Sequence, residues 1–122
     1  MNIRWSEKVD EILSAGKWDE YHHNWLLTKE QTLVAMDKLR KAGIGVLGGD
    51  VSEIREGRFE YNYDNWHCDP EEGESDADFA LRSYIAAKNY INAYPVIVPE
   101  KPIDFFFEIV PETKKRFQQI QK

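Results

Sequence analysis

Apolar side chains recur every three or four residues in several segments of the chain, which is the spacing of a helix that buries one face. The clearest segment starts at Thr28, which has capping-box spacing with Gln31, and continues to Gly43, which can take the left-handed conformation at a helix end. A shorter segment begins with Ser6 as its N-cap, and a left-handed Gly16 is expected to end it. Both segments are predicted to be helices.

Two more helices are predicted nearer the C-terminus. Ser75 can cap a segment whose apolar residues recur at helical spacing, and Tyr94 and Pro95 end it. Pro111 can open a last amphipathic turn or helix that runs to Ile120. The helical pattern therefore predicts three to four helices.

Other segments have the patterns of strands. Residues 51–64 alternate with period two around a tight turn at Glu56-Gly57, and this pattern predicts a β-hairpin. Residues 44–47 are apolar and rich in β-branched side chains, and Gly48-Gly49 after them is interpreted as a bend or bulge. The near-continuous apolar run 103–110 is expected in the middle of a sheet that is covered on both faces.

Helices and strands do not alternate regularly along the chain, so the predicted fold class is α+β. We expect a mainly antiparallel sheet, including the hairpin near 51–64, packed by three to four helices. A length of 122 residues fits a single domain that spans residues 1–122.

Negative charge is concentrated in residues 50–78, here called the acidic segment. It holds eleven carboxylates against Arg55 and Arg58, a net charge of −9, whereas the whole chain has a net charge of −6. Crowded like charges repel one another, and large aromatic residues lie among them. We therefore expect the acidic segment to bind a basic partner; a solvated acidic face without a function is the alternative.

The predicted partner-binding residues are carboxylates of the acidic segment and one tryptophan. They are Asp50, Glu53, Glu60, Asp64, Trp66, Asp69, Glu71, Glu72 and Glu74. A tryptophan among charged residues is typical of an interface anchor, but Trp66 fits a place in the core equally well.

Catalytic, metal and cofactor chemistry has little support in the sequence. The glycines of residues 43–48 have the spacing of a dinucleotide-binding loop, but a helix precedes them and a strand follows, which is the reverse of what pyrophosphate binding needs. The adjacent side chains of His67, Cys68 and Asp69 diverge and cannot easily meet at one metal ion. We predict no cofactor, no metal and no enzymatic activity.

The acidic balance of the chain, with a pI of about 5.1, argues against nucleic acid as a partner. Charged residues near the N-terminus exclude a secretory signal there, and no run approaches the roughly 20 apolar residues of a membrane span. The one cysteine, Cys68, cannot form an internal disulfide. We expect a cytoplasmic protein that does not bind membranes.

Several short strings together resemble a known family. They are Gly48-Gly49-Asp50, Tyr63-Asp64-Asn65-Trp66, and Glu72-Gly73-Glu74-Ser75 at the start of a predicted helix. In these strings the chain resembles small bacterial immunity proteins, which are encoded beside polymorphic toxins of contact-dependent inhibition and related secretion systems. The resemblance implies a protein without enzymatic activity that binds its cognate toxin domain in the cytoplasm and blocks it.

Two further functions remain open at this point. The carboxylates could serve a small enzyme or a calcium-binding protein, although residues 69–76 lack the spacing of an EF-hand loop. The chain could also be a general protein-interaction module. The sequence does not determine the oligomeric state.

Overall fold

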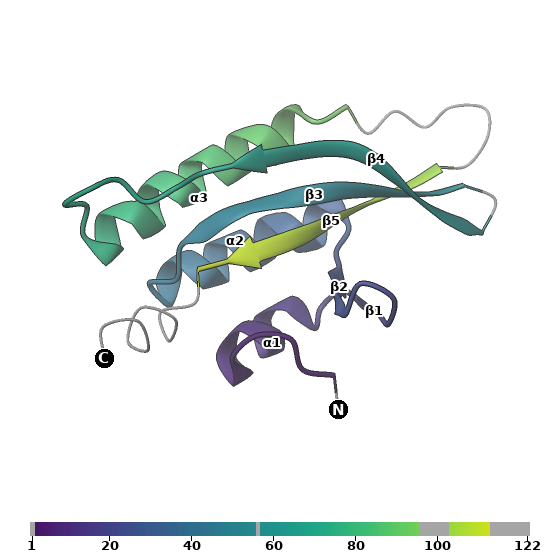
Figure 1. Cartoon of the computed structure of the whole chain (residues 1–122), viewed down its shortest axis with the longest axis horizontal. Coiled ribbons are helices and arrows are strands. Elements are labelled where there is room, and N and C mark those ends of the chain that lie inside the picture. Colours follow the sequence, from purple (N-terminus) through teal and green to yellow (C-terminus); the bar gives the residue numbers. More distant parts are fainter. Residues whose placement is uncertain (1, 56, 96–102, 113–122) are drawn as a thin grey trace.

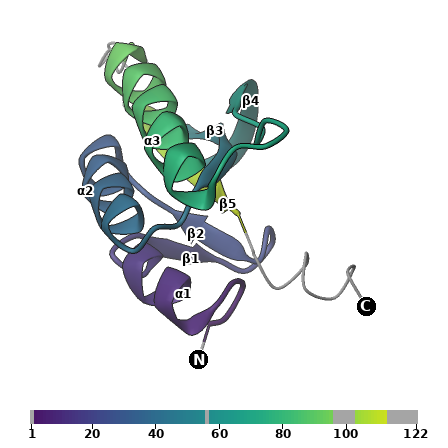
Figure 2. The same ribbon diagram turned by 90° about the vertical axis from the view of Figure 1, so that its left-hand side faces the viewer.

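The fold has two antiparallel sheets and three helices in the described part of the chain. The computed structural model describes residues 2–55, 57–95 and 103–112. Helices α2 (Lys29–Lys41) and α3 (Asp76–Ala93) lie on one side of a three-stranded sheet (Figure 1). Helix α1 (Glu7–Leu13) lies beside a smaller, two-stranded sheet, below α2 in the view of Figure 2. The predicted α+β class is confirmed.

The three-stranded sheet is built around one long hairpin. Strand β3 (Val46–Arg55) pairs with β4 (Arg58–His67), and Gly57 in the turn between them has φ +78°. The predicted hairpin is confirmed, and it extends beyond residues 51–64 at both ends. Strand β5 (Ile103–Pro111) pairs with the other edge of β3, so the strand order is β4-β3-β5.

The expectation that residues 103–110 lie in the middle of a sheet is wrong, because β3 is the central strand and β5 lies at the edge. The outer edge of β5 is nevertheless covered. Leu27 and Phe107 exchange two backbone hydrogen bonds of 3.0 and 2.7 Å, and the side chain of Asn24 donates to the carbonyl of Ile109. Burial by these contacts explains why the edge strand is as apolar as a central one.

The predicted helix starts are confirmed by their caps. The hydroxyl of Ser6 accepts a hydrogen bond from the Val9 N–H at 3.3 Å. Thr28 and Gln31 form a reciprocal capping box, with hydrogen bonds of 3.2 and 3.0 Å. Gly43 has φ +72°, as expected for the residue that ends α2.

Gly16 is not left-handed, and the prediction for this residue is wrong. Helix α1 ends at a right-handed Ser14 instead. A Cβ atom at residue 16 would lie 2.4 Å from the carbonyl oxygen of Leu26 and 2.8 Å from Cγ of Leu27. Glycine is required here by the close approach of the small sheet and not by its backbone angle.

The small sheet was not expected from the sequence. It pairs β1 (Lys17–Asp19) with β2 (Asn24–Leu26), and the rings of Trp18 and Trp25 meet edge to face with centroids 5.0 Å apart. Strands of three residues are too short to show an alternating pattern. Pro111 does not open a helix, because it is the last residue of β5 and pairs with Val46. The rest of the last predicted helix, from residue 113 to Ile120, lies outside the described residues.

The core between the sheet and α3 depends on a glycine in the central strand. Trp66 lies over Gly49, its cross-strand neighbour, and is 7% exposed. On its other side Trp66 stacks on Tyr90 of α3, with centroids 4.9 Å apart and an interplanar angle of 28°. The ring therefore fills the space that a side chain at residue 49 would occupy. No helix in the described part of the chain combines the length and the apolar character that a membrane span requires.

We predict that Gly49→Ala lowers the free energy of unfolding by about 1–3 kcal/mol, because overpacking a close-packed core displaces its neighbours. The new Cβ would lie 2.4 Å from Cη2 of Trp66 and 2.6 Å from the Glu108 carbonyl oxygen. Chemical denaturation provides the measurement. Gly57→Ala is the matched control, because no atom lies within 4 Å and only its positive φ opposes the change. A Gly49→Ala variant that is as stable as the unchanged protein would contradict the proposed packing.

Candidate functional site

The structure divides the predicted partner-binding residues into exposed and buried groups. Those exposed are Asp50, Asp64, Asp69, Glu71 and Glu72, while Glu74 is half-buried. Glu53 and Trp66 are buried, so their side chains offer little surface to a partner. The side chain of Glu60 lies outside the described part of the structure. The acidic segment therefore has two kinds of residues. Most of its carboxylates are exposed, while Glu53 and Trp66 are buried and help to support them.

Of the two interpretations of Trp66, the structure favours the core. The ring is enclosed by Gly49 and Tyr90, as described above. Glu53 is also buried, and a hydrogen bond of 2.9 Å from Arg55 compensates for the burial of its carboxylate. Both residues shape the sheet that carries the exposed carboxylates.

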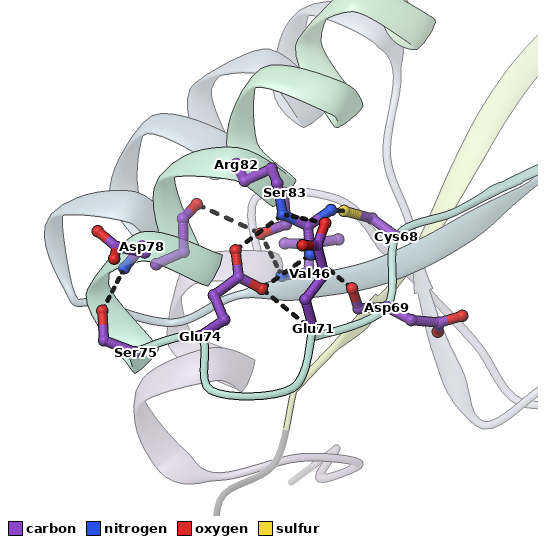
Figure 3. A network of polar contacts seen from close by, with 10 residues as sticks. Val46, Cys68, Asp69, Glu71, Glu74, Ser75, Asp78, Arg82 and Ser83 are labelled. Atoms are coloured by element: carbon purple, nitrogen blue, oxygen red, sulfur yellow. Dashed lines mark hydrogen bonds and ion pairs between the residues drawn. The ribbon is translucent and has the colours of Figure 1, made fainter.

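The densest group of exposed carboxylates lies on the acidic loop, residues 69–75, which joins β4 to α3. Figure 3 shows that Arg82, from the second turn of α3, reaches back across this loop. Its Nε and Nη2 atoms donate to the two carboxylate oxygens of Glu74, both at 2.8 Å. Nη2 also donates to the Asp69 carbonyl at 2.5 Å. One arginine thus fixes both ends of the acidic loop.

Backbone contacts complete the acidic loop. The Glu71 N–H donates to Glu74 Oε1 and the Glu74 N–H donates to the Glu71 carbonyl, each at 3.0 Å. Gly73 between them has φ +79°, a conformation that suits glycine. The Ser75 hydroxyl then caps α3 by accepting from the Asp78 N–H at 3.1 Å (Figure 3). These contacts hold the loop in one shape without using the carboxylates of Asp69 and Glu72.

The electrostatic effect of Arg82 falls mainly on Glu74. The hydrogen bonds from the guanidinium lower the pKa of Glu74 to about 2. Glu71 is a more distant partner, with its Oε1 atom 3.7 Å from Nε of Arg82, and it stays largely exposed. The acidic loop therefore keeps most of its negative charge at the surface at neutral pH.

Asp64 and Asp50 form a second group of exposed carboxylates, on the three-stranded sheet. Together with Val51, Tyr63 and Asn65 they line a surface hollow of about 330 Å³. Asp64 Oδ2 accepts a hydrogen bond of 2.7 Å from the hydroxyl of Tyr94 at the end of α3. Burial and this hydrogen bond raise the pKa of Tyr94, so its hydroxyl keeps the proton that it donates.

Cys68 does not have the surroundings of a nucleophile. It is buried, and burial raises the pKa of its thiol. A neutral thiol reacts poorly, because the thiolate is the reactive form. Arg82 Nη1 contacts its sulfur at 3.3 Å, which makes Cys68 part of the framework of the acidic loop.

Sequence reasoning missed one group of titratable side chains. Asp19, His22 and Glu108 bring three possible metal-ligating atoms within 4.8 Å of one another, and no other group of this kind occurs among the described residues. His22 Nδ1 contacts Asp19 Oδ2 and lies 3.9 Å from Glu108 Oε1. Burial raises the pKa of Glu108 to about 7, against the opposing effect of His22. His22 and Glu108 are 86 positions apart in the sequence, so no short spacing could reveal this group.

Comparison with known proteins gives one match. A family model described as Immunity protein 40 matches residues 14–111, a range that includes both sheets, α2, α3 and the whole acidic segment. No curated protein and no solved structure matches the chain.

The Glu74–Arg82 pair predicts a specific loss of stability in acid. A carboxylate whose pKa is lowered by folding stabilises the protein above its unfolded pKa, near 4.5, and this contribution is lost as the pH falls toward 2. We expect Glu74→Gln to lose less stability between pH 5 and pH 2 than the unchanged protein does. Denaturant unfolding at several pH values measures this, with Glu72→Gln as the control at an exposed neighbour. Parallel pH profiles for Glu74→Gln and the unchanged protein would contradict the role given to Arg82.

Proposed function

The chain belongs to the Immunity protein 40 family, and we propose that it neutralises its toxin by covering a basic surface of that toxin with the acidic loop and the neighbouring carboxylates. Membership in this family confirms the resemblance to immunity proteins that the sequence suggested. It makes the protein an immunity protein whose partner is a toxin. Two points are our proposal: which surface of the immunity protein binds the toxin, and how this binding blocks the toxin.

The single observation that carries the proposal is the rigid display of charge on the acidic loop. Asp69, Glu71 and Glu72 are exposed, while the hydrogen bonds that shape the loop come from Arg82, Glu74 and the backbone. A loop that is already ordered loses little conformational freedom on binding. A fixed group of like charges also directs the approach of an oppositely charged partner.

The chemistry of the partner follows from the sign of this charge. We infer that the toxin presents lysine and arginine side chains in a cleft, as an enzyme that acts on nucleic acid would. The acidic loop then occupies the cleft in place of the phosphates of the substrate. Inhibition of this kind needs no chemical step by the immunity protein, and we place it in the cytoplasm of the cell that produces the toxin.

A direct test begins with the neighbouring gene. We expect a large secreted protein with a C-terminal toxin domain to be encoded beside this chain. That domain, purified and mixed with the protein, should form a stable complex and lose its toxic activity. A neighbouring domain that neither binds nor is inhibited would argue against this pairing.

Charge reversal on the acidic loop should weaken the complex. We predict that Asp69→Lys with Glu72→Lys lowers affinity for the purified neighbouring toxin domain about tenfold or more, because like charges then face each other across the interface. The free energy of unfolding should change by no more than about 0.5 kcal/mol, since both side chains are exposed.

The matched control for charge reversal is Glu7→Lys with Glu30→Lys. This variant has the same net charge, and both changed side chains are exposed outside the acidic segment. Calorimetric titration gives the affinities and denaturation gives the stabilities. An equal loss of affinity in the two double variants would show that overall charge, and not the acidic loop, governs binding, and unchanged affinity in both would exclude an electrostatic interface on the acidic loop.

The association rate should depend strongly on salt. Screening shortens the reach of charge to about 8 Å at 0.15 M ionic strength, so we expect the association rate constant to fall about tenfold or more between low and physiological salt. Stopped-flow mixing measures this rate, and the dependence should be weaker for the Asp69→Lys, Glu72→Lys variant. A rate that does not change with salt would indicate an interface built on apolar contacts.

A further inference from the structure

An irregularity in β4 places an aromatic side chain at the edge of the candidate surface. One residue, Val51, lies between Asp50 and Ser52 of β3, whereas three residues lie between their partners Asn65 and Tyr61. The extra residues form the β4 bulge, residues 62–64. At its centre Tyr63 has φ +66°, in the left-handed region, and its side chain is 84% exposed.

This backbone conformation is unfavourable for tyrosine. A bulky residue with a positive φ is a rare outlier, and glycine or asparagine would adopt the same conformation at lower cost. Such outliers persist where the surrounding structure imposes them, and they are concentrated at functional sites. Bulges also redirect side chains at the places where proteins bind their partners.

The surrounding structure does impose the β4 bulge. The hydroxyl of Tyr94 accepts from Asn62 Nδ2 and donates to Asp64 Oδ2, each at 2.7 Å, so it connects both ends of the bulge. Within the bulge, the Asp64 N–H donates to Asn62 Oδ1 at 2.9 Å. The Tyr63 carbonyl accepts from Asn65 Nδ2 at 3.0 Å.

Tyr94 is itself held by the core. Its ring contacts Tyr90, Phe105 and Phe107, with centroid distances of 5.9, 5.9 and 5.7 Å. The position of the bulge is therefore fixed from α3 and β5, and Tyr63 is presented on a rigid support. A large side chain with few rotatable bonds on a rigid support loses little entropy when it becomes buried in an interface.

We propose that Tyr63 is an anchor of the toxin interface: its ring packs into the toxin surface, and a lysine or arginine of the toxin enters the hollow between Asp50 and Asp64 beside it. This inference rests on the proposed function, because it names a residue of the same interface. Tyrosine is enriched among the residues that contribute most to protein–protein affinity. A basic side chain in the hollow meets two carboxylates and lies near a ring that attracts cations.

The test compares Tyr63→Ala with Tyr21→Ala in titrations against the purified neighbouring toxin domain. Tyr21 is the matched control, since it is 88% exposed and lies in the turn between β1 and β2. We expect Tyr63→Ala to bind about 30-fold more weakly or worse, as a hot-spot residue does. Tyr21→Ala should bind as the unchanged protein does, and neither variant should lose stability.

Tyr63→Gly separates the side chain from the backbone. Glycine accepts the positive φ, so this variant should unfold at the same or a higher temperature while its affinity falls as in Tyr63→Ala. Tyr94→Phe keeps the ring and removes the hydroxyl that connects the bulge. As a change at a positioning residue, it should weaken binding in the presence of Tyr63 and have a smaller effect when combined with Tyr63→Ala, because only its effect through Asp64 then remains.

The outcomes distinguish this inference from the proposed function. If Tyr63→Ala binds as tightly as the unchanged protein while Asp69→Lys with Glu72→Lys binds weakly, Tyr63 is not an anchor and the acidic loop remains the interface. If Tyr63→Ala weakens binding and the charge reversal does not, the anchor holds and the interface is not governed by the acidic loop. If neither change affects binding, both proposals are wrong.

Discussion

The structure depends on the absence of a side chain at Gly49, in the middle of the central strand. Because this position has no side chain, the Trp66 ring can pack closely against β3 and also stack on Tyr90. Tyr90 in turn contacts Tyr94, which reaches the rings of β5 and the bulge in β4. A single series of ring contacts thus sets the distance between sheet and helix and also the shape of the surface. The geometry of the surface therefore depends on the packing of the core, since close-packed side chains transmit displacements to their neighbours.

The acidic segment holds its crowded carboxylates in place in two ways, one on the acidic loop and one on the sheet. On the acidic loop, Arg82 binds Glu74 and the backbone, and this leaves Asp69 and Glu72 exposed in a fixed arrangement. On the sheet, the hydroxyl of Tyr94 donates a hydrogen bond to Asp64, whose side chain stays exposed. In both places one stabilising contact comes from α3 or from its C-cap residue, so this helix supports the candidate surface near both of its ends (Figure 1).

The sequence predicted those features that depend on neighbouring residues. The caps at Ser6 and Thr28 and the hairpin turn at Gly57 are local, and each appears in the structure as expected. The place of β5 in the sheet was misjudged because an apolar run reports burial and not strand order. The pairing of Trp66 with Gly49 and the convergence of His22 with Glu108 arise from tertiary contacts. The sequence predicted that the candidate surface is negatively charged. It did not predict that Arg82, Tyr94 and Tyr63 give this surface its shape, because their contacts arise only in the folded chain.

The bridge between Leu27 and Phe107 has a consequence for the timing of folding on the ribosome. It joins residues 80 positions apart, and the pairs of the β3–β5 ladder are 48 to 65 positions apart. Such non-local pairings form slowly, because loops must close before any contact compensates for the lost entropy. A nascent chain can form α1 and α2 early, but the sheet that supports the acidic segment needs residue 111 to have left the exit tunnel. On the function proposed above, protection by a newly made molecule would begin only after synthesis of β5, and a cell would depend on molecules finished earlier when toxin is already present.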